Sequence, residues 1–79
     1  MTRAAAVVEA VARALADRPD AVKVAEREAR GQTFIELTMA PGDMGRVIGR
    51  QGRTAQAVRT LASLAGELDG ARVSVDFRD

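Results

Sequence analysis

Two glycines three residues apart, Gly49 and Gly52, constrain this 79-residue chain more than any other feature. They lie between two stretches with helical periodicity and enclose Arg50 and Gln51. Because glycine has no Cβ atom, such a pair lets the backbone turn tightly and approach a ligand closely. The N-terminus of the second helix presents N–H groups to a phosphate. The segment therefore predicts a turn between two helices with the chemistry of an anion-binding loop.

A glycine pair at this spacing is a weak signal alone, because a chain with seven glycines often contains one by chance. A second pair, Gly42 and Gly45, encloses Asp43 and follows Pro41. Proline and an acid at these positions are typical of a helix N-terminus, so this pair predicts the start of a helix rather than an anion site. The plain alternative for the first pair is a structural turn.

The distribution of charge favours the first pair as a binding loop. Residues 44–66 carry a charge of +4 and the rest of the chain −3, although the net charge is only +1. The four arginines of this region, with no acid among them, are Arg46, Arg50, Arg53 and Arg59. A basic surface on an otherwise acidic domain is typical of phosphate binding, whereas the simpler interpretation is a solvated helix face.

The composition excludes several classes of function. With 47% hydrophobic and 29% charged residues, the chain is predicted to fold as one domain over residues 1–79. It has no cysteine and no histidine, so we expect no disulfide, no metal site, no cofactor and no catalytic activity. The alanine-rich run over residues 4–16 is short and interrupted by Glu9 and Arg13, which argues against a membrane span or a signal peptide and predicts a cytoplasmic protein.

Hydrophobic patterning predicts the order helix, strand, strand, helix, helix, strand. A first helix capped by Thr2 precedes a hairpin whose second strand covers residues 33–39. A short helix over residues 41–48 and a longer one from Arg53, closed by Gly66 or Gly70, lead to a last strand over residues 72–78. The predicted buried residues are Val7, Val8, Val11 and Leu15; Val22 and Val24; Thr33, Ile35, Leu37 and Met39; Ala55, Val58, Leu61, Ala62 and Ala65; and Val73, Val75 and Phe77. Three strands covered on one face by three helices form a two-layer α+β domain.

With its two flanking helices, the segment over residues 40–61 resembles a KH domain of type II, and within that group the small bacterial RNA-binding proteins that consist of a single KH domain. The resemblance covers nearly the whole chain, and Arg72-Val73-Ser74-Val75 fits the last strand of the family. Ala55 departs from the larger aliphatic residue of many KH domains. The resemblance implies a single-stranded RNA-binding protein that acts as an RNA chaperone or post-transcriptional regulator, with cell-shape regulation among its roles. It also implies a homodimer, or a heterodimer with another KH-containing bacterial protein.

The resemblance also implies which residues contact RNA, since a KH domain holds about four nucleotides with its GxxG loop. Gly49 and Gly52 would allow close approach, Arg50 and Gln51 would contact phosphates, and Arg53 would add charge. Further candidates are Arg46 and Arg59, a groove floor of Gly45 and Ile48, and an opposite wall of Arg72 and Val73. For Ile48, an ordinary core position is an equal alternative.

Other nucleic-acid-binding folds and one other function can be weighed against RNA binding by a KH domain. Only Phe34 and Phe77 are aromatic, so the chain has little with which to build the stacking surfaces of RRM or OB folds. The main alternative is a protein-interaction module in which the glycine loop is structural. Direct crosslinking of the isolated protein to RNA separates the two classes.

Overall fold

The secondary structure elements follow the predicted order. The computed structural model describes residues 1–78. Its helices and strands are α1 (Arg3–Leu15), β1 (Lys23–Ala29), β2 (Gln32–Thr38), α2 (Met44–Ile48), α3 (Arg53–Leu68) and β3 (Arg72–Arg78). Short 3-10 turns occupy Pro19–Ala21 and Arg50–Gly52. The predicted α+β class and element order are confirmed.

The central strand of the sheet is β2. It pairs antiparallel with β1 and parallel with β3, so that Ile35 lies opposite Glu26 on one side and Val75 on the other. The hairpin turn between β1 and β2 is Arg30-Gly31, whose φ angles of 52° and 75° suit the primed turns of two-residue hairpins. Parallel pairing needs a long crossover, which α2 and α3 supply.

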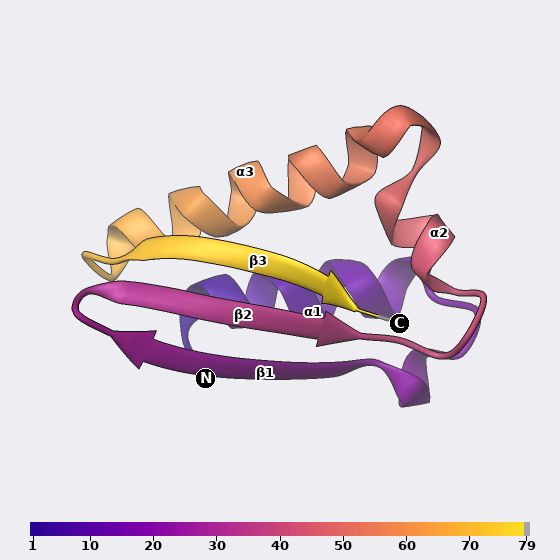
Figure 1. The fold of residues 1–79 in the computed structure, drawn as a ribbon, viewed down its shortest axis with the longest axis horizontal. Coiled ribbons are helices and arrows are strands. Elements are labelled where there is room, and N and C mark those ends of the chain that lie inside the picture. The colour runs from indigo at the N-terminus through magenta and orange to yellow at the C-terminus, as the bar shows by residue number, and fades with distance from the viewer. Residues whose placement is uncertain (79) are drawn as a thin grey trace.

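All three helices lie on one side of the sheet, and the other face is open. Figure 1 shows α1 behind the sheet and α3 running beside β3, with the start of α3 at the end where β2 and β3 finish. Burial alternates along β2, where Thr33, Ile35 and Leu37 are buried. Their neighbours along the strand belong to the opposite face. The predicted two-layer arrangement is thus confirmed.

The core of α1 is made mainly of alanine, which differs from the valine stripe that we predicted. The buried residues of α1 are Ala4, Ala5, Val8 and Ala12. Val7 and Val11 are only half-buried, and Leu15 is 38% exposed, so its predicted burial is wrong. Small side chains allow α1 to lie close to α3 and the sheet, and that close approach selects the alanine face of the helix.

The buried face of α3 is also narrower than predicted. Ala55, Val58, Ala62 and Ala65 are buried as expected, but Leu61 is 48% exposed. Consecutive residues of a helix are about 100° apart, so a buried face that contains Ala62 turns Leu61 outward. Leu64 and Leu68 are exposed on the same helix, at 54% and 73%.

A glycine closes α3, and it is Gly70 rather than Gly66. Gly70 has φ of 69° and donates its N–H to Glu67, while Ala71 donates to Gly66. These two bonds form a Schellman motif, which satisfies the last carbonyl groups of a helix. Gly66 lies within α3, where a Cβ atom would meet the side chain of Val73 and lie 3.0 Å from the carbonyl oxygen of Ala71.

The start of α2 also differs from the prediction, because the helix begins at Met44 and not at residue 41. Asp43 donates its N–H to the carbonyl of Ala40 at 3.0 Å, and Gly42 has φ of 89°. Proline at the second position and a glycine with positive φ at the third are the signature of a type II turn. Pro41 therefore serves the turn that follows β2, and the helix starts after it.

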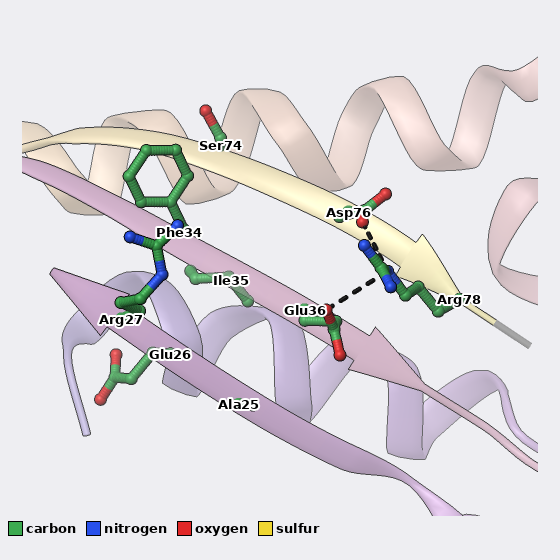
Figure 2. Close-up of a pocket in the computed structure, with 9 residues that line it drawn as sticks. All are labelled: Ala25, Glu26, Arg27, Phe34, Ile35, Glu36, Ser74, Asp76 and Arg78. Atoms are coloured by element: carbon green, nitrogen blue, oxygen red, sulfur yellow. Dashed lines mark hydrogen bonds and ion pairs between the residues drawn. The ribbon is translucent and has the colours of Figure 1, made fainter. Parts of the chain in front are cut away.

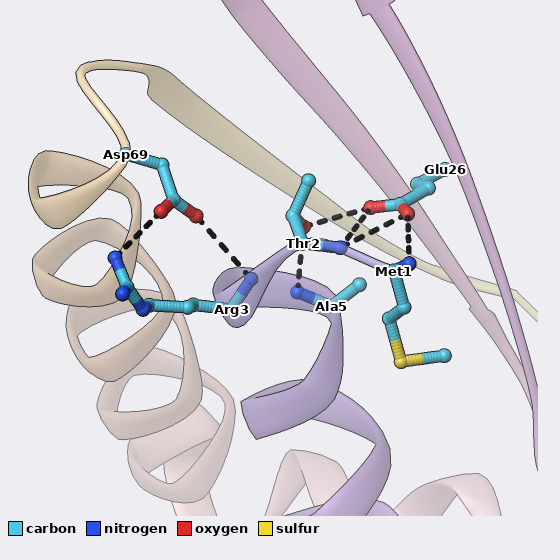
Figure 3. Close-up of polar contacts among 6 residues, drawn as sticks. All are labelled: Met1, Thr2, Arg3, Ala5, Glu26 and Asp69. Atoms are coloured by element: carbon cyan, nitrogen blue, oxygen red, sulfur yellow. Dashed lines mark hydrogen bonds and ion pairs between the residues drawn. The ribbon is translucent and has the colours of Figure 1, made fainter.

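Polar contacts join the N-terminal end of α1 to β1 and to the end of α3 (Figure 3). The Thr2 hydroxyl accepts from the N–H of Ala5, as predicted for a cap, and donates to Glu26 of β1 at 2.7 Å. Arg3 is ion-paired at 2.8 Å with Asp69, which follows α3. These contacts fix the layer of α1 and α3 against the sheet.

Candidate nucleic-acid interface

The loop between α2 and α3 has a backbone that favours glycine at two positions. Gly49 has φ of 74° and ψ of 174°, and Gly52 has φ of 73° and ψ of 14°. The first pair of angles belongs to a region that is almost exclusive to glycine. A Cβ atom on Gly49 would also meet the Thr54 hydroxyl and lie 3.1 Å from its backbone nitrogen. The close approach of Gly49 to the first turn of α3 explains the first glycine of the pair.

Between these glycines, the two polar side chains point into solvent. Arg50 and Gln51 are exposed, and Gln51 has φ of 58°, which is uncommon for a residue with a side chain. The guanidinium of Arg53 donates to the Gln51 side chain at 3.3 Å. No side chain caps α3, because its N-cap residue is Gly52. The loop therefore places arginine side chains, and no acidic side chain, beside the N-terminal end of α3.

The four arginines of the basic region are not equivalent. Within residues 1–78, Arg50 and Arg53 form no ion pair, whereas Arg46 lies 3.7 Å from Asp43. Asp43 is buried and accepts the N–H of Arg18 at 3.0 Å, so it fixes α2 to the segment after α1. Asp43 offsets part of the charge of Arg46, whereas Arg50, Arg53 and Arg59 have no ion-pair partner within residues 1–78.

Arg59 joins α3 to the edge strand β3. Its guanidinium carbon lies 4.7 Å from the centroid of the Phe77 ring, and its Nε donates to the carbonyl of Val75 at 3.4 Å. Both contacts are on the C-terminal half of β3. The predictions did not connect Phe77 or Val75 with the site, although the alternation along the last strand placed them on the helix side.

On α2, the predicted floor residues are open to solvent to different degrees. Gly45 is exposed, and a Cβ atom there would have no atom within 4 Å, so packing does not require glycine at this position. Ile48 is half-buried, while its neighbour Val47 is fully buried in the core. The core position on this turn is therefore Val47, and Ile48 retains surface for a ligand.

Arg72 and Val73 lie far from the loop. Because β3 is parallel to β2, it begins at the end of the sheet where α3 finishes, and α3 is about 24 Å long. Figure 1 shows the start of β3 and the loop before α3 at opposite ends of the molecule. The structure brings together Gly49, Arg50, Gln51, Gly52, Arg53 and the residues of α2, but not Arg72.

A helix–GxxG–helix unit, with a preceding helix and hairpin and a last strand parallel to the central strand, defines a KH domain of type II. The family model described as the KH domain of KhpA and KhpB matches residues 5–77. The chain therefore belongs to the KhpA/KhpB KH-domain family.

Relatives that are each named RNA-binding protein KhpA align along most of the chain. The one from Caldanaerobacter subterraneus is 50% identical over 71 residues, which are 90% of this chain and 95% of the relative. The one from Halalkalibacterium halodurans is 45% identical over 73 residues, or 92% and 96% of the two chains. The one from Streptomyces coelicolor is 42% identical, covering 91% and 87%.

Other classes of site have no counterpart within residues 1–78. None of the helices within residues 1–78 is long and apolar enough to cross a bilayer. Over the same residues, no three acidic side chains come together as a potential metal site.

Proposed function

We propose that this protein binds single-stranded RNA and clamps the RNA backbone with the loop from Gly49 to Gly52. The observation that carries the proposal is the combination of a glycine-only backbone at Gly49 with exposed arginines on both sides of Gly52 that form no ion pair within residues 1–78. The names of the relatives support it, because each is called an RNA-binding protein.

In this proposal, the loop and α3 share the contacts with phosphates. Arg50 and Gln51 reach the phosphate oxygens, and Arg53 adds charge where the dipole of α3 favours an anion. Gly45 and Ile48 supply an open, partly apolar surface for a base. Arg59 presents its guanidinium between α3 and β3, where it already stacks on Phe77. In this proposal the protein binds RNA and catalyses no reaction. It acts in the cytoplasm, where its RNA ligands are found.

An interaction between protein chains is the second part of the proposal, because α3 exposes an apolar stripe. We define the leucine stripe as Ala57, Leu61, Leu64 and Leu68, all exposed to solvent. These residues are spaced by four, three and four positions, and this order is the same when α3 is followed from either end. A twofold axis with antiparallel α3 helices sets Leu61 against the second copy's Leu64. We infer a homodimer through this stripe, with a heterodimer of KH-containing chains as the alternative outcome of its test.

The double substitution Arg50→Asp and Gln51→Asp tests the loop. It changes the loop charge by three units and places carboxylates where phosphates should lie, so the affinity for a fluorescent single-stranded RNA should fall more than tenfold in an anisotropy titration. A charge-matched control is Ala6→Glu with Arg13→Glu, on the exposed side of α1. The control should retain most of the affinity.

A loop variant that keeps both its circular dichroism spectrum and its RNA affinity would contradict this proposal. The loop would then be a structural turn, and the interaction-module alternative would be favoured. Both substituted positions are exposed, and substitutions at such sites usually change stability by less than about 0.5 kcal/mol. The fold should therefore survive the change.

A further inference from the structure

The open face of the sheet carries an exposed aromatic ring. Phe34 is on the central strand β2 and is 36% exposed, although the helices all lie on the other side. Arg27 of β1 lies opposite it, with its guanidinium carbon 4.4 Å from the ring centroid. Figure 2 shows Arg27 against the ring, with Ser74 of β3 near its other edge. The pair presents flat, stackable surface to solvent.

Charges divide this face into two halves. In the half toward the end of β3, Arg78 is ion-paired with Asp76 at 2.8 Å and Glu36 at 3.2 Å (Figure 2). The hydrogen bond with Asp76, and then the charge of Glu36, raise the pKa of Arg78 above its ordinary value. The strand register gives this face two acids, Glu36 and Asp76, and both are compensated by Arg78.

The half around Phe34 is basic: the strand register places no acid on it, although Glu26, whose position belongs to the helix side, also lines the hollow beside the ring. Arg72 is paired with Gln32, the position next to Phe34 on the same face, and Arg30 is in the adjoining hairpin turn. Within residues 1–78, none of Arg27, Arg30 and Arg72 forms an ion pair. We define the Phe34 patch as Arg27, Arg30, Gln32, Phe34, Arg72 and Ser74, with a charge of +3.

We propose that the Phe34 patch is a second contact surface for single-stranded RNA. A base stacks on the pair formed by Phe34 and Arg27, and Arg30 and Arg72 bind the flanking phosphates. A shallow hollow of about 320 Å³ beside the ring gives the base room. Its lining includes Arg27, Phe34 and Arg78 and three acids, Glu26, Glu36 and Asp76, of which Glu36 and Asp76 are ion-paired with Arg78. Any base can stack on an aromatic ring or a guanidinium plane, so this contact needs no particular sequence.

The chemistry of the patch favours a nucleic acid over an acidic protein segment. Three unpaired arginines attract any polyanion, but a carboxylate gains little from a flat aromatic surface. A nucleotide carries both a phosphate and a planar base, and so it matches both components of the patch.

This inference rests on the proposed RNA binding by the loop and extends it to longer strands. The loop and the start of β3 lie at opposite ends of a molecule whose longest dimension is 34 Å (Figure 1). A KH loop holds about four nucleotides, so a strand that occupies both surfaces must be longer than that. The patch therefore adds affinity for long RNA and little for a tetranucleotide bound at the loop.

NMR titration of the whole protein provides the direct test. A four-nucleotide oligouridine should shift the amides of residues 49–53 first. An oligouridine of about 20 nucleotides should shift those amides and also the amides of Arg27, Phe34 and Arg72. If the long RNA shifts the loop amides and leaves the patch amides unchanged, the second surface is refuted.

Variants then separate charge from stacking. Arg30→Gln with Arg72→Gln should lower the affinity for the long RNA at least fivefold and reduce the salt slope by about 1.4, since each phosphate contact on a single strand contributes about 0.7. Phe34→Thr should lower the affinity with the salt slope unchanged, because stacking is not ionic. The charge-matched control, Arg13→Gln with Arg18→Gln, replaces two exposed arginines elsewhere and should bind nearly as the wild type does.

The outcomes for the patch and for the loop are distinct. If Arg30→Gln with Arg72→Gln binds long RNA as the control does, the Phe34 patch is not an RNA site, even when the loop variant loses binding. If the wild type binds neither RNA, or the loop variant binds both with full affinity, the loop proposal fails.

Discussion

At the scale of single residues, the two glycines of the loop have different reasons to be glycine. Gly49 combines a glycine-only backbone with close contact to Thr54, whereas Gly52 has positive φ and open space where a Cβ atom would lie. A sequence pattern cannot distinguish these cases, because the letter is the same. The structure predicts that the two positions respond differently to the same substitution.

We expect Gly49→Ala to destabilise the fold by about 3 kcal/mol or more, because a strained backbone and overpacking against Thr54 each cost about 1–3 kcal/mol. Gly52→Ala should cost only about 1–2 kcal/mol, the usual penalty for a left-handed residue. Urea unfolding of both variants measures the difference. Equal losses of unfolding free energy in the two variants would show that the contact between Gly49 and Thr54 does not add to the cost of a side chain at Gly49.

At the scale of secondary structure elements, α3 carries three surfaces with separate tasks. Its alanine face packs against the core, its N-terminus borders the loop, and its leucine stripe is exposed. Gly66 belongs to the packed surface, because it allows β3 to pass close to the helix at Val73.

The packing of Gly66 can be tested by the same substitution in two helical glycines. Alanine is favoured over glycine in helices by about 1 kcal/mol, so Gly45→Ala, with open space around it, should raise the free energy of unfolding. Gly66→Ala should instead lower it by about 1–3 kcal/mol, since the new methyl group overlaps Val73. Thermal unfolding with matched baselines gives the sign of each change. A stabilised Gly66→Ala variant would contradict the close approach.

The leucine stripe gives a prediction for assembly. Leu61→Glu with Leu64→Lys keeps the net charge and should convert a dimer to a monomer in light scattering at micromolar concentration. The fold should persist, because both leucines are about half exposed. The control, Gln56→Glu with Ser63→Lys on the neighbouring exposed face, should remain a dimer. A wild-type protein that is monomeric alone but forms a one-to-one complex with another KH-containing chain would favour the heterodimer.

Element types were predictable where local pattern and packing agree. The alternation in β2 and β3 fixed which residues face the helices, because a strand has only two faces. Helical faces were less certain, since alanine can be either core or surface, and the sequence predicted burial for Leu61 and Leu15 that the tertiary packing does not provide. Pro41 suits both a helix start and a type II turn, and the path of the chain after β2 decides for the turn.

The sequence was sufficient to predict that the loop residues lie together, but it was not sufficient to predict where Arg72 lies relative to them. The loop is local, so its residues stay together in any fold of this order. The position of Arg72 depends on whether β3 pairs parallel or antiparallel with β2, which the periodicity of a strand does not reveal. Parallel pairing moves Arg72 to the opposite end of the sheet, where it joins Arg27 and Phe34.

At the scale of the whole molecule, the charge separation predicts a salt-dependent affinity. Residues 44–66 carry +4 within a chain of net charge +1. Three or four phosphate contacts on a single strand give a slope of log K against log salt of about −2 to −3. Titration of a short RNA at several salt concentrations measures it, and a flat response would contradict phosphate binding by the loop.

The free edge of β1 has a consequence for behaviour in concentrated solution. An outer strand with unpaired N–H and C=O groups can template aggregation by joining the sheet of another molecule. Four of the seven residues of β1 are charged: Lys23, Glu26, Arg27 and Glu28. Inserting that strand into a continuous intermolecular sheet would confine these charges, which disfavours polymerisation through this edge. Self-association of the domain through the β1 edge is thereby disfavoured.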